Sequence, residues 1–497
     1  MQQKPRLGLP GNPPSARASR QAVPTLGLDK SRISRIIVKN LYRKIFDQGA
    51  SMQPKENSLN FPVSTGSLLK YALPTILSNL FMNVYTIVDQ LFVSNLLGTD
   101  ALSAVSIAWP LLTIALAVGT MIGTGGCALV SNQMGAGDNE AARQNFSFFV
   151  VFCTVVSAVI CVLGIGLRRP VLYAMGADDA LYPLCQAYAV PVFLLIPFAM
   201  AGMFFQIFLV AAGKPGLGFG LSIAGGITNM VLDYVLIARI PLGITGAALA
   251  TAAGYVLQSL IGGIFFLRNR QGTLYLVRPR FNGQALAQAC FNGMSEMVTM
   301  LSITVVSIAM NVILMHLVGS EGVAASAVIL SAQTILSAGY AGYVQGIGPV
   351  ISFHYGAAHE DVLKTLYRTA LKTIAFLSTI TFLLAFPLAR PIARLFAKNA
   401  APVLEMAVRG TFIFAGAFLL MGFNQFASGF FTALNDGRTS AILSLFRTLI
   451  FLLLPLLTLP WLLGIDGVWM SMPVAEVLSI ALSVFYFRRM KGKYHYA

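Results

Sequence analysis

Charged residues are scarce in this sequence: Asp, Glu, Lys and Arg make up 10% of its 497 residues, whereas hydrophobic residues make up 56%. A soluble domain carries roughly 25% charged residues, which cover its water-facing surface. The chain therefore lacks the composition of a soluble protein. Long apolar segments inside a membrane explain it better.

Cysteine and histidine are also few, with five and four residues. The cysteines have no paired spacing, so neither a disulfide framework nor a zinc site is indicated. The nucleotide-binding motif G-x-x-x-x-G-K-[ST] is absent, because Gly213-Lys214 is followed by Pro215. G-x-S-x-G and H-E-x-x-H are absent too, and we recognise no catalytic cluster. We expect a protein that is not an enzyme and uses no cofactor.

Basic residues outnumber acidic ones by 34 to 18, and their placement indicates the partner. Eleven of the 34 lie in residues 1–66, and most others lie in short connections between apolar segments. A nucleic-acid-binding protein gathers them on one folded face, whereas a membrane protein places them in its cytoplasmic connections. We expect contact with a lipid bilayer and none with nucleic acid.

Twelve apolar runs reach the roughly 20 residues that a helix needs to span a bilayer. They lie near residues 67–96, 101–132, 144–167, 180–212, 217–238, 243–267, 284–317, 322–352, 365–389, 402–433, 439–460 and 464–487. A shift of 221 positions matches the two halves without gaps, so that Gly135 meets Gly356 and Arg169 meets Arg390. We predict an all-α membrane protein of two six-helix bundles related by a pseudo-twofold axis along the membrane normal.

The predicted organisation has four parts: a basic extension (1–60), an N-terminal six-helix lobe (61–270), a cytoplasmic linker (271–283) and a C-terminal six-helix lobe (284–490). With the N-terminus inside and residues through Lys70 left out, the inner connections and the C-terminus hold fifteen Lys and Arg, counting Arg447 near a helix end. The outer connections hold seven, which places both termini in the cytoplasm. Residues 31–46 carry an apolar stripe that suits a helix on the inner leaflet. The polar composition of the extension favours disorder instead.

Ionisable residues inside a membrane are costly and are candidates for function. The acids well inside apolar runs are Asp89, Asp233, Glu296 and Glu476. Asp89 lies about 13 Å below the outer end of the first helix, at 1.5 Å per residue, and Asp233 lies about two turns from the outer end of the fifth. These two aspartates are therefore expected in one layer of the membrane.

Three more polar residues are predicted in that layer. Asn229 shares a helix face with Asp233, and Thr251 and Tyr188 reach the same depth on the sixth and fourth helices. Two carboxylates in a low dielectric cannot both stay charged cheaply, so one holds a proton or both share a cation. Together with Asp89 these residues predict a site for H⁺ or Na⁺ and for no other metal. Structural hydrogen bonds between helices are the alternative.

The second half has lost this set of residues. Asp89 and Asp233 meet Met310 and Leu454 at the offset of 221. Polarity needed only for helix packing should have survived in both halves. The ion chemistry is therefore assigned to the first half.

The other two acids and one proline leave alternatives open. Glu296 either lines a central cavity and attracts cationic substrates or pairs near a helix end, and Glu476 has no visible partner. Pro74 lies in the helix of Asp89, where it removes a backbone hydrogen bond. It either lets that helix bend on protonation or makes a static kink.

Over residues 64–490 the sequence resembles the multidrug and toxic compound extrusion (MATE) family. The resemblance lies in Leu73-Pro74-Thr75 with Val88-Asp89, Gly135-Ala136-Gly137, Asn229-x-x-x-Asp233, Gly246 through Thr251, and Gly348-Pro349 through Tyr355-Gly356-Ala357. It implies an antiporter that exports organic, often cationic, compounds or drugs in exchange for H⁺ or Na⁺ by alternating access. We expect a monomer in the cytoplasmic membrane of a bacterium.

The resemblance also assigns residues. Asp89, Tyr188, Asn229, Asp233 and Thr251 match the family's first-lobe cation site. Positions where some members contact drugs are matched by Tyr85 and Gln206.

One departure and one alternative function remain. Some sodium-coupled members use acids in helices seven and ten, whereas helix ten here offers Asn424-Gln425, so coupling through the first lobe is favoured. The alternative is a flippase for lipid-linked saccharides of the same wider superfamily. It should place more cationic side chains in its cavity than Arg409 and Arg447. A membrane enzyme and an ion channel fit less well.

Overall fold

The first half of the chain forms six long helices and one short one. The structure, a computed structural model, describes residues 58–97, 99–396 and 400–497, so nearly all of the predicted extension, including residues 31–46, lies outside the described residues. The elements are α2 (Thr65–Leu97), α3 (Thr99–Gly135), α4 (Asn139–Gly166), α5 (Arg168–Ala174), α6 (Tyr182–Ala211), α7 (Pro215–Asp233), the π-helix η1 (Tyr234–Arg239) and α8 (Gly243–Arg268).

The second half also contains six long spans, but among its described residues no short helix corresponds to α5, and its π-helix lies inside the fifth span rather than at its end. Its elements are α9 (Gly283–Leu317), α10 (Ser320–Gly356), α11 (Glu360–Phe396), α12 (Ala401–Ala433), α13 (Gly437–Leu445), the π-helix η2 (Phe446–Ile450), α14 (Phe451–Leu463) and α15 (Ile465–Tyr494). Within the described ranges every regular element is helical, and 12 spans are long and apolar enough to cross a membrane. The predicted number of transmembrane helices is therefore confirmed.

Helix ends differ from the prediction where polar residues continue a helix beyond its apolar run. Helix α11 covers Glu360–Phe396 rather than 365–389 and includes Pro387 and Pro391, and α15 extends to Tyr494 rather than 487. Backbone hydrogen bonds continue through residues of any polarity, so apolar length underestimates a helix that reaches into the headgroup region. The short helix α5 was not predicted for the same reason, since it lies between two apolar runs.

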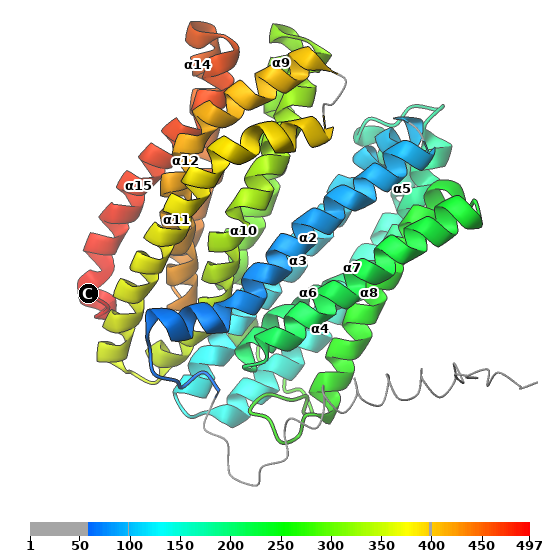
Figure 1. The fold of residues 1–497 in the computed structure, drawn as a ribbon. Coiled ribbons are helices and arrows are strands. Elements are labelled where there is room, and N and C mark those ends of the chain that lie inside the picture. Colours follow the sequence, from blue (N-terminus) through cyan, green and yellow to red (C-terminus); the bar gives the residue numbers. More distant parts are fainter. Residues whose placement is uncertain (1–57, 98, 397–399) are drawn as a thin grey trace, which may run out of the picture. The chain divides into compact units, whose positions relative to one another are not determined.

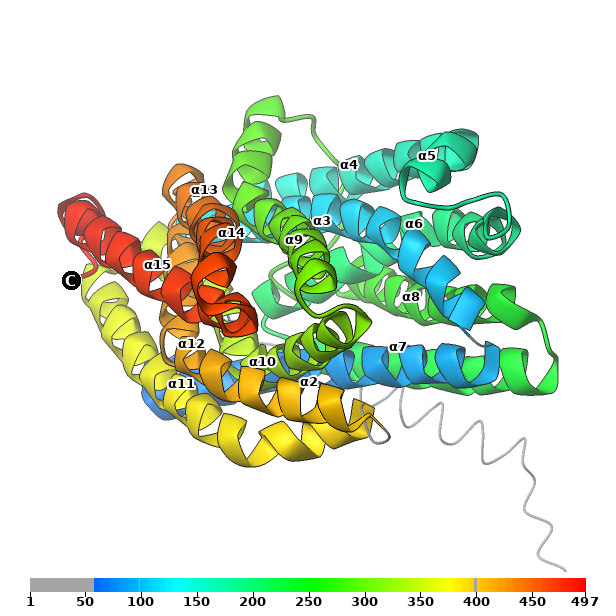
Figure 2. The ribbon, with the colours of Figure 1, turned by 90° about the horizontal axis from the view of Figure 1, so that it is seen from above.

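We call α2–α8 the N lobe and α9–α15 the C lobe. Figure 1 shows the helices of each lobe side by side, and Figure 2 shows α3 beside α9 and α2 beside α10, where the lobes meet. The segment between α8 and α9 packs on α4, where Arg143 donates from Nε to the Thr273 carbonyl at 2.9 Å and Ser147 Oγ accepts from Val277 N at 2.9 Å.

The repeat of 221 residues is visible in the backbone. Gly243 begins α8 and Gly464 directly precedes α15, the last helix of each half, and both have positive φ, 59° and 60°. The contact of α3 with α10 is reciprocal: a Cβ on Gly135 would lie 1.9 Å from the Phe353 carbonyl oxygen, and one on Gly356 would lie 2.0 Å from that of Asn132. Since Asn132 and Phe353 are also 221 positions apart, a pseudo-twofold axis relates the two sides of this contact.

This reciprocal contact generates a prediction about stability. Gly135→Ala would place a methyl group against the backbone of α10, so α3 and α10 must separate, at a cost of about 1–3 kcal/mol as in other overpacked sites. Thermal melting of the detergent-solubilised protein, followed by size-exclusion chromatography, measures the loss. Gly339→Ala in α10 is the control, because its Cβ would meet no atom within 4 Å. Equal melting of both variants would contradict the proposed close packing.

Candidate cation and substrate sites

Asp89 of α2 and Asp233 of α7 face each other. Asp233 is fully buried, Asp89 is partly buried, and their carboxyl groups lie within hydrogen-bonding reach. Within the described part of the chain, Asp89 Oδ1 and both carboxyl oxygens of Asp233 are buried without a hydrogen-bond donor. Buried oxygens without donors are costly unless a proton or a cation satisfies them. The pair is therefore suited to bind an exchangeable positive charge.

The other predicted members surround this pair. Asn229 of α7 is 2% exposed, interacts with Asp89, and donates from Nδ2 to Thr251 Oγ1 of α8 at 3.4 Å. Tyr188 of α6 is buried close enough to both aspartates for electrostatic interaction. The structure thus brings all five predicted residues together from four helices.

Close packing of α7 on α8 allows this convergence. A Cβ on Gly254 of α8 would lie 2.8 Å from the carbonyl oxygen of Gly225 in α7. Small residues let membrane helices approach in this way. Asp233 is the last residue of α7 and directly precedes the π-helix η1, a type of wide turn that is frequent at functional sites.

A sixth residue, Tyr255 of α8, belongs to the site and was missed by the sequence analysis. Its side chain lies close to Tyr85 and close enough to Asp89 for electrostatic interaction. Tyr255 lies four positions after Thr251 and therefore on the same helix face, a spacing that could have indicated it. Tyr85 itself was predicted to contact substrate, whereas the structure places it beside the cation site, four positions before Asp89.

The five oxygen-bearing side chains suit H⁺ or Na⁺ and not a transition metal. Carboxylate, amide and hydroxyl oxygens are ligands for hard cations, and Asp89, Asn229, Asp233 and Thr251 supply them. Among the residues that the structure describes, no group of three or more His, Cys, Asp and Glu could hold a metal ion.

A cavity of about 200 Å³ lies between the lobes, next to α2. Its lining includes Thr75 and Asn79 of α2, Gln206 of α6, Glu296 of α9 and Gln345 of α10. Glu296 is the one charged side chain among the described lining residues. Of the two roles left open for Glu296, the structure favours the cavity-lining one. Gln206 also lines this cavity, as predicted, and donates to Ser222 Oγ at 2.5 Å.

A second cavity, of about 410 Å³, lies mostly within the C lobe and shares Asn79 and Gln345 with the first. Its apolar lining includes Trp469 and Phe414, and its two charged residues are Arg447 and Glu476. Arg409, the other basic residue considered for a cavity, instead pairs with Asp466, from Nε to Oδ1 at 3.0 Å, and its side chain is 70% exposed.

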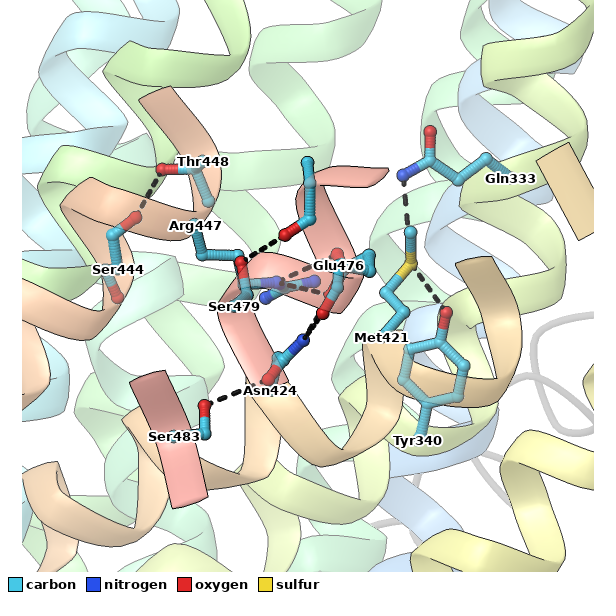
Figure 3. A network of polar contacts seen from close by, with 11 residues as sticks. Gln333, Tyr340, Met421, Asn424, Ser444, Arg447, Thr448, Glu476, Ser479 and Ser483 are labelled. Carbon is cyan, nitrogen blue, oxygen red and sulfur yellow. Dashed lines mark hydrogen bonds and ion pairs between the residues drawn. The ribbon is translucent and has the colours of Figure 1, made fainter. Parts of the chain in front are cut away.

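The expectation that Glu476 has no partner was wrong. Glu476 of α15 is 1% exposed and accepts hydrogen bonds from Arg447 Nε of η2 at 3.0 and 3.3 Å and from Asn424 Nδ2 of α12 at 2.6 Å (Figure 3). Ser483 Oγ donates to Asn424 Oδ1 at 2.9 Å and so orients the amide. Sequence spacing did not show this network because its members come from three segments up to 59 positions apart.

Pro74 lies inside α2, between Ala72 and Ile76, which closely approach Gly346 and Gly342 of α10. Figure 1 shows the first part of α2 at an angle to the rest of the helix, as expected for a helix that contains proline. The residue after it, Thr75, has its Oγ1 buried without a hydrogen-bond partner in the described residues.

Comparison with known proteins agrees with this architecture. The family model MatE matches residues 74–235 and 297–457. The chain belongs to the MatE family. The resemblance to MATE transporters inferred from sequence motifs is therefore confirmed.

Relatives in the family cover most of the chain. It is 22% identical to the multidrug export protein MepA of Staphylococcus saprophyticus over 419 residues, which are 83% of this chain and 90% of the relative. The MepA protein of Staphylococcus aureus is 23% identical over 420 residues, with 83% and 91% covered.

Solved MATE structures share the fold. An outward-facing multidrug resistance MATE family transporter matches with a TM-score of 0.84 at 19% identity, covering 89% of this chain and 99% of that one. A MOP superfamily transporter from Pyrococcus furiosus matches with a TM-score of 0.82 at 19% identity, covering 88% and 99%. The predicted fold of two six-helix lobes is confirmed.

The buried Arg447–Glu476 pair generates a second prediction. Arg447→Gln leaves Glu476 buried without its cation and should cost about 3–5 kcal/mol, whereas the double variant Arg447→Gln/Glu476→Gln should lose little, because replacing a whole buried pair is often neutral. Thermal melting of purified protein tests this order. A double variant that melts below Arg447→Gln would show that the pair does not behave as a compensated buried charge.

Proposed function

We propose that the protein is a secondary active antiporter that exports organic, often cationic, compounds in exchange for H⁺ or Na⁺. One observation carries the proposal: the facing carboxyl groups of Asp89 and Asp233, with three buried oxygens that lack donors. Such a pair changes its net charge when it binds a proton or cation. Family membership and the names of the relatives, multidrug export proteins, support the direction and type of cargo.

Helix α2 is the proposed link between ion and substrate. It carries Asp89 at the cation site and lines the interlobe cavity with Asn79, which donates to Gln345 Oε1 of α10 at 3.0 Å. Asn83 donates to the Thr334 carbonyl of α10 at 2.9 Å. Binding a positive charge at Asp89 changes the attraction of α2 to α7, and the bend near Pro74 lets α2 move against α10. The two ligands then favour different positions of one helix, which is what coupling requires.

A cationic substrate is proposed to bind in the interlobe cavity near Glu296. A half-buried carboxylate in a cavity attracts a positive charge more strongly than one in bulk water, because water screens it less. The amide groups of Gln206, Asn79 and Gln345 supply hydrogen bonds, and apolar residues supply the remaining contact. Because the proposed ion site and the proposed substrate cavity are separate, ion and substrate can be coupled by their different affinities for two conformations rather than by direct competition.

Alternating access is proposed as rocking of the lobes. In the proposed topology the reciprocal contact at Gly135 and Gly356 lies on the cytoplasmic side, so the present arrangement is closed there. Release of substrate outward and of the ion inward would follow as the lobes exchange positions. A flippase for lipid-linked saccharides has less support, because the one arginine in the described cavities is balanced by Glu476.

Localisation and assembly are part of the proposal. We infer a bacterial cytoplasmic membrane from the staphylococcal relatives and cytoplasmic termini from the distribution of Lys and Arg. One chain supplies all residues of both cavities and of the cation site, so we expect a monomer.

Transport in inside-out vesicles tests the coupling site. Wild type should take up a fluorescent organic cation under an imposed H⁺ or Na⁺ gradient, and the gradient that drives uptake identifies the ion. Asp89→Asn and Asp233→Asn should each lose roughly 5- to 150-fold of the gradient-driven rate, the range of typical coupling free energies.

Asp361→Asn is the matched control, since the Asp361 side chain is fully exposed beside Lys364. If wild type transports and both membrane aspartate variants match it at equal protein levels, coupling does not use this pair.

Topology has its own test. Green fluorescent protein fused after Ala497 should fluoresce, because it folds in the cytoplasm, and alkaline phosphatase at the same position should be inactive. Alkaline phosphatase fused after Ala180, between α5 and α6, should be active outside. Activity after Ala497 would reverse the assigned orientation.

A further inference from the structure

We propose that the C-lobe cavity binds the carboxylate or sulfonate group of zwitterionic amphiphiles through the guanidinium group of Arg447. This inference rests on the proposed function and names a substrate class for it: compounds with an ammonium group, an apolar body and one anionic group. Glu296 attracts the ammonium group, and Arg447 selects compounds that also carry the anion.

Arg447 has donors to spare. Its Nε is engaged by Glu476, whereas Nη1 and Nη2 make no hydrogen bond within the described part of the chain. Neither terminal nitrogen is among the buried side-chain atoms that lack a partner, so both remain accessible from the cavity that Arg447 lines. Two parallel N–H groups in a plane match the two oxygens of a carboxylate or sulfonate.

Glu476 fixes the position of the Arg447 side chain by accepting hydrogen bonds from its Nε. It is 1% exposed, is bonded to Asn424 and through it to Ser483, and lies on the rigid helix α15 (Figure 3). A guanidinium whose Nε is fixed loses less conformational freedom when its terminal nitrogens bind a ligand. A purely structural ion pair would be expected to use these terminal donors on the protein itself.

Charge balance selects a zwitterion over a simple anion. Arg447 and Glu476 cancel each other, so a bare anion would leave the low-dielectric cavity with a net negative charge. Glu296 is close enough to Arg447 for electrostatic interaction, and the two cavities share Asn79 and Gln345. A ligand that presents an anion to Arg447 and an ammonium group to Glu296 pairs each of its charges with an opposite one and adds no net charge to the cavities.

The cavity also suits the apolar body of such a ligand. Its volume of about 410 Å³ falls in the range of small-molecule pockets, about 300–1,000 Å³. Trp469 and Phe414 offer aromatic surface, and Met472 offers an adaptable thioether. Lipid-linked diphosphates fit less well, because one balanced arginine cannot neutralise several negative charges.

Two fluorescent probes test the role of the anion directly. Nε-dansyl-lysine is zwitterionic, and dansylcadaverine has the same body and ammonium group but no carboxylate. Binding to the purified protein in lipid nanodiscs is measured by dansyl fluorescence against empty nanodiscs. Wild type should bind dansyl-lysine more tightly than dansylcadaverine by roughly tenfold, the worth of a hydrogen-bonded charged group.

The double variant Arg447→Gln/Glu476→Gln isolates the anion site, because it removes the pair without leaving a buried charge. It should lose the preference for dansyl-lysine and keep its affinity for dansylcadaverine. The single variant Arg447→Lys keeps a positive charge but lacks the planar pair of donors. It should therefore retain only part of the preference for dansyl-lysine. Glu296→Gln should weaken both probes, since both carry the ammonium group.

Three results would overturn the inference. Wild type could show no preference for dansyl-lysine, or the double variant could keep that preference. The double variant could also lose both probes equally, which would indicate a structural role. Gradient-driven uptake of dansylcadaverine by wild type is measured separately and reports on the proposed antiport. The antiport can therefore stand when the anion site fails.

Discussion

The cost of placing a charged group inside a bilayer constrains most of what is specific to this protein. Its apolar helices can be exchanged for other apolar sequences at modest cost, but a carboxylate in hydrocarbon needs a proton, a cation or a basic partner. The two lobes show two different ways of compensating a carboxylate. Asp89 and Asp233 face each other with oxygens that lack donors, whereas Glu476 is bonded to Arg447 and Asn424.

These two ways of compensation have different consequences for mechanism. The N-lobe pair is satisfied only by something that arrives and leaves, so its occupancy can follow the ion concentrations on the two sides of a membrane. The C-lobe glutamate is satisfied permanently by a side chain, so its charge does not depend on an ion. In the proposed mechanism the N lobe exchanges the driving ion, and the proposed Arg447 site lets the C lobe select among substrates.

The sequence predicted the fold and the N-lobe site for physical reasons. Apolar length indicates a membrane helix whatever its neighbours are, and an offset of 221 is evident where turns require glycine, as at Gly243 and Gly464. The depth of Asp89, Asp233 and Thr251 follows from the rise of a helix. Tyr255 could have been found by the same helical spacing from Thr251.

The C-lobe network could not be predicted in this way. Depth in the membrane does not say which face of a helix meets which neighbour, and the pairing of Arg447 with Glu476 depends on how α12, η2 and α15 pack. Arg447 was considered as a cavity residue from the sequence, but nothing in the sequence indicated that it pairs with Glu476. Tyr85 was assigned to the substrate because it matches a position where some family members contact drugs. That match does not tell which way its side chain points in this chain.

The two π-helices have a consequence for how the halves correspond. The fifth helix of each half contains one wide turn, but η1 covers Tyr234–Arg239 while η2 covers Phe446–Ile450, which is equivalent to residues 225–229. Each π-helix adds one residue to its helix, so the two halves align without gaps on both sides of these turns. Between the position of η2 and the position of η1, however, the two fifth helices differ in phase by one residue, a rotation of roughly 100°. Arg447 aligns with Gly226, whose Cβ would meet the rings of Phe81 and Tyr85. Two halves that align without gaps can thus point aligned positions in different directions, and the fifth helix carries an acid in one lobe and an arginine in the other.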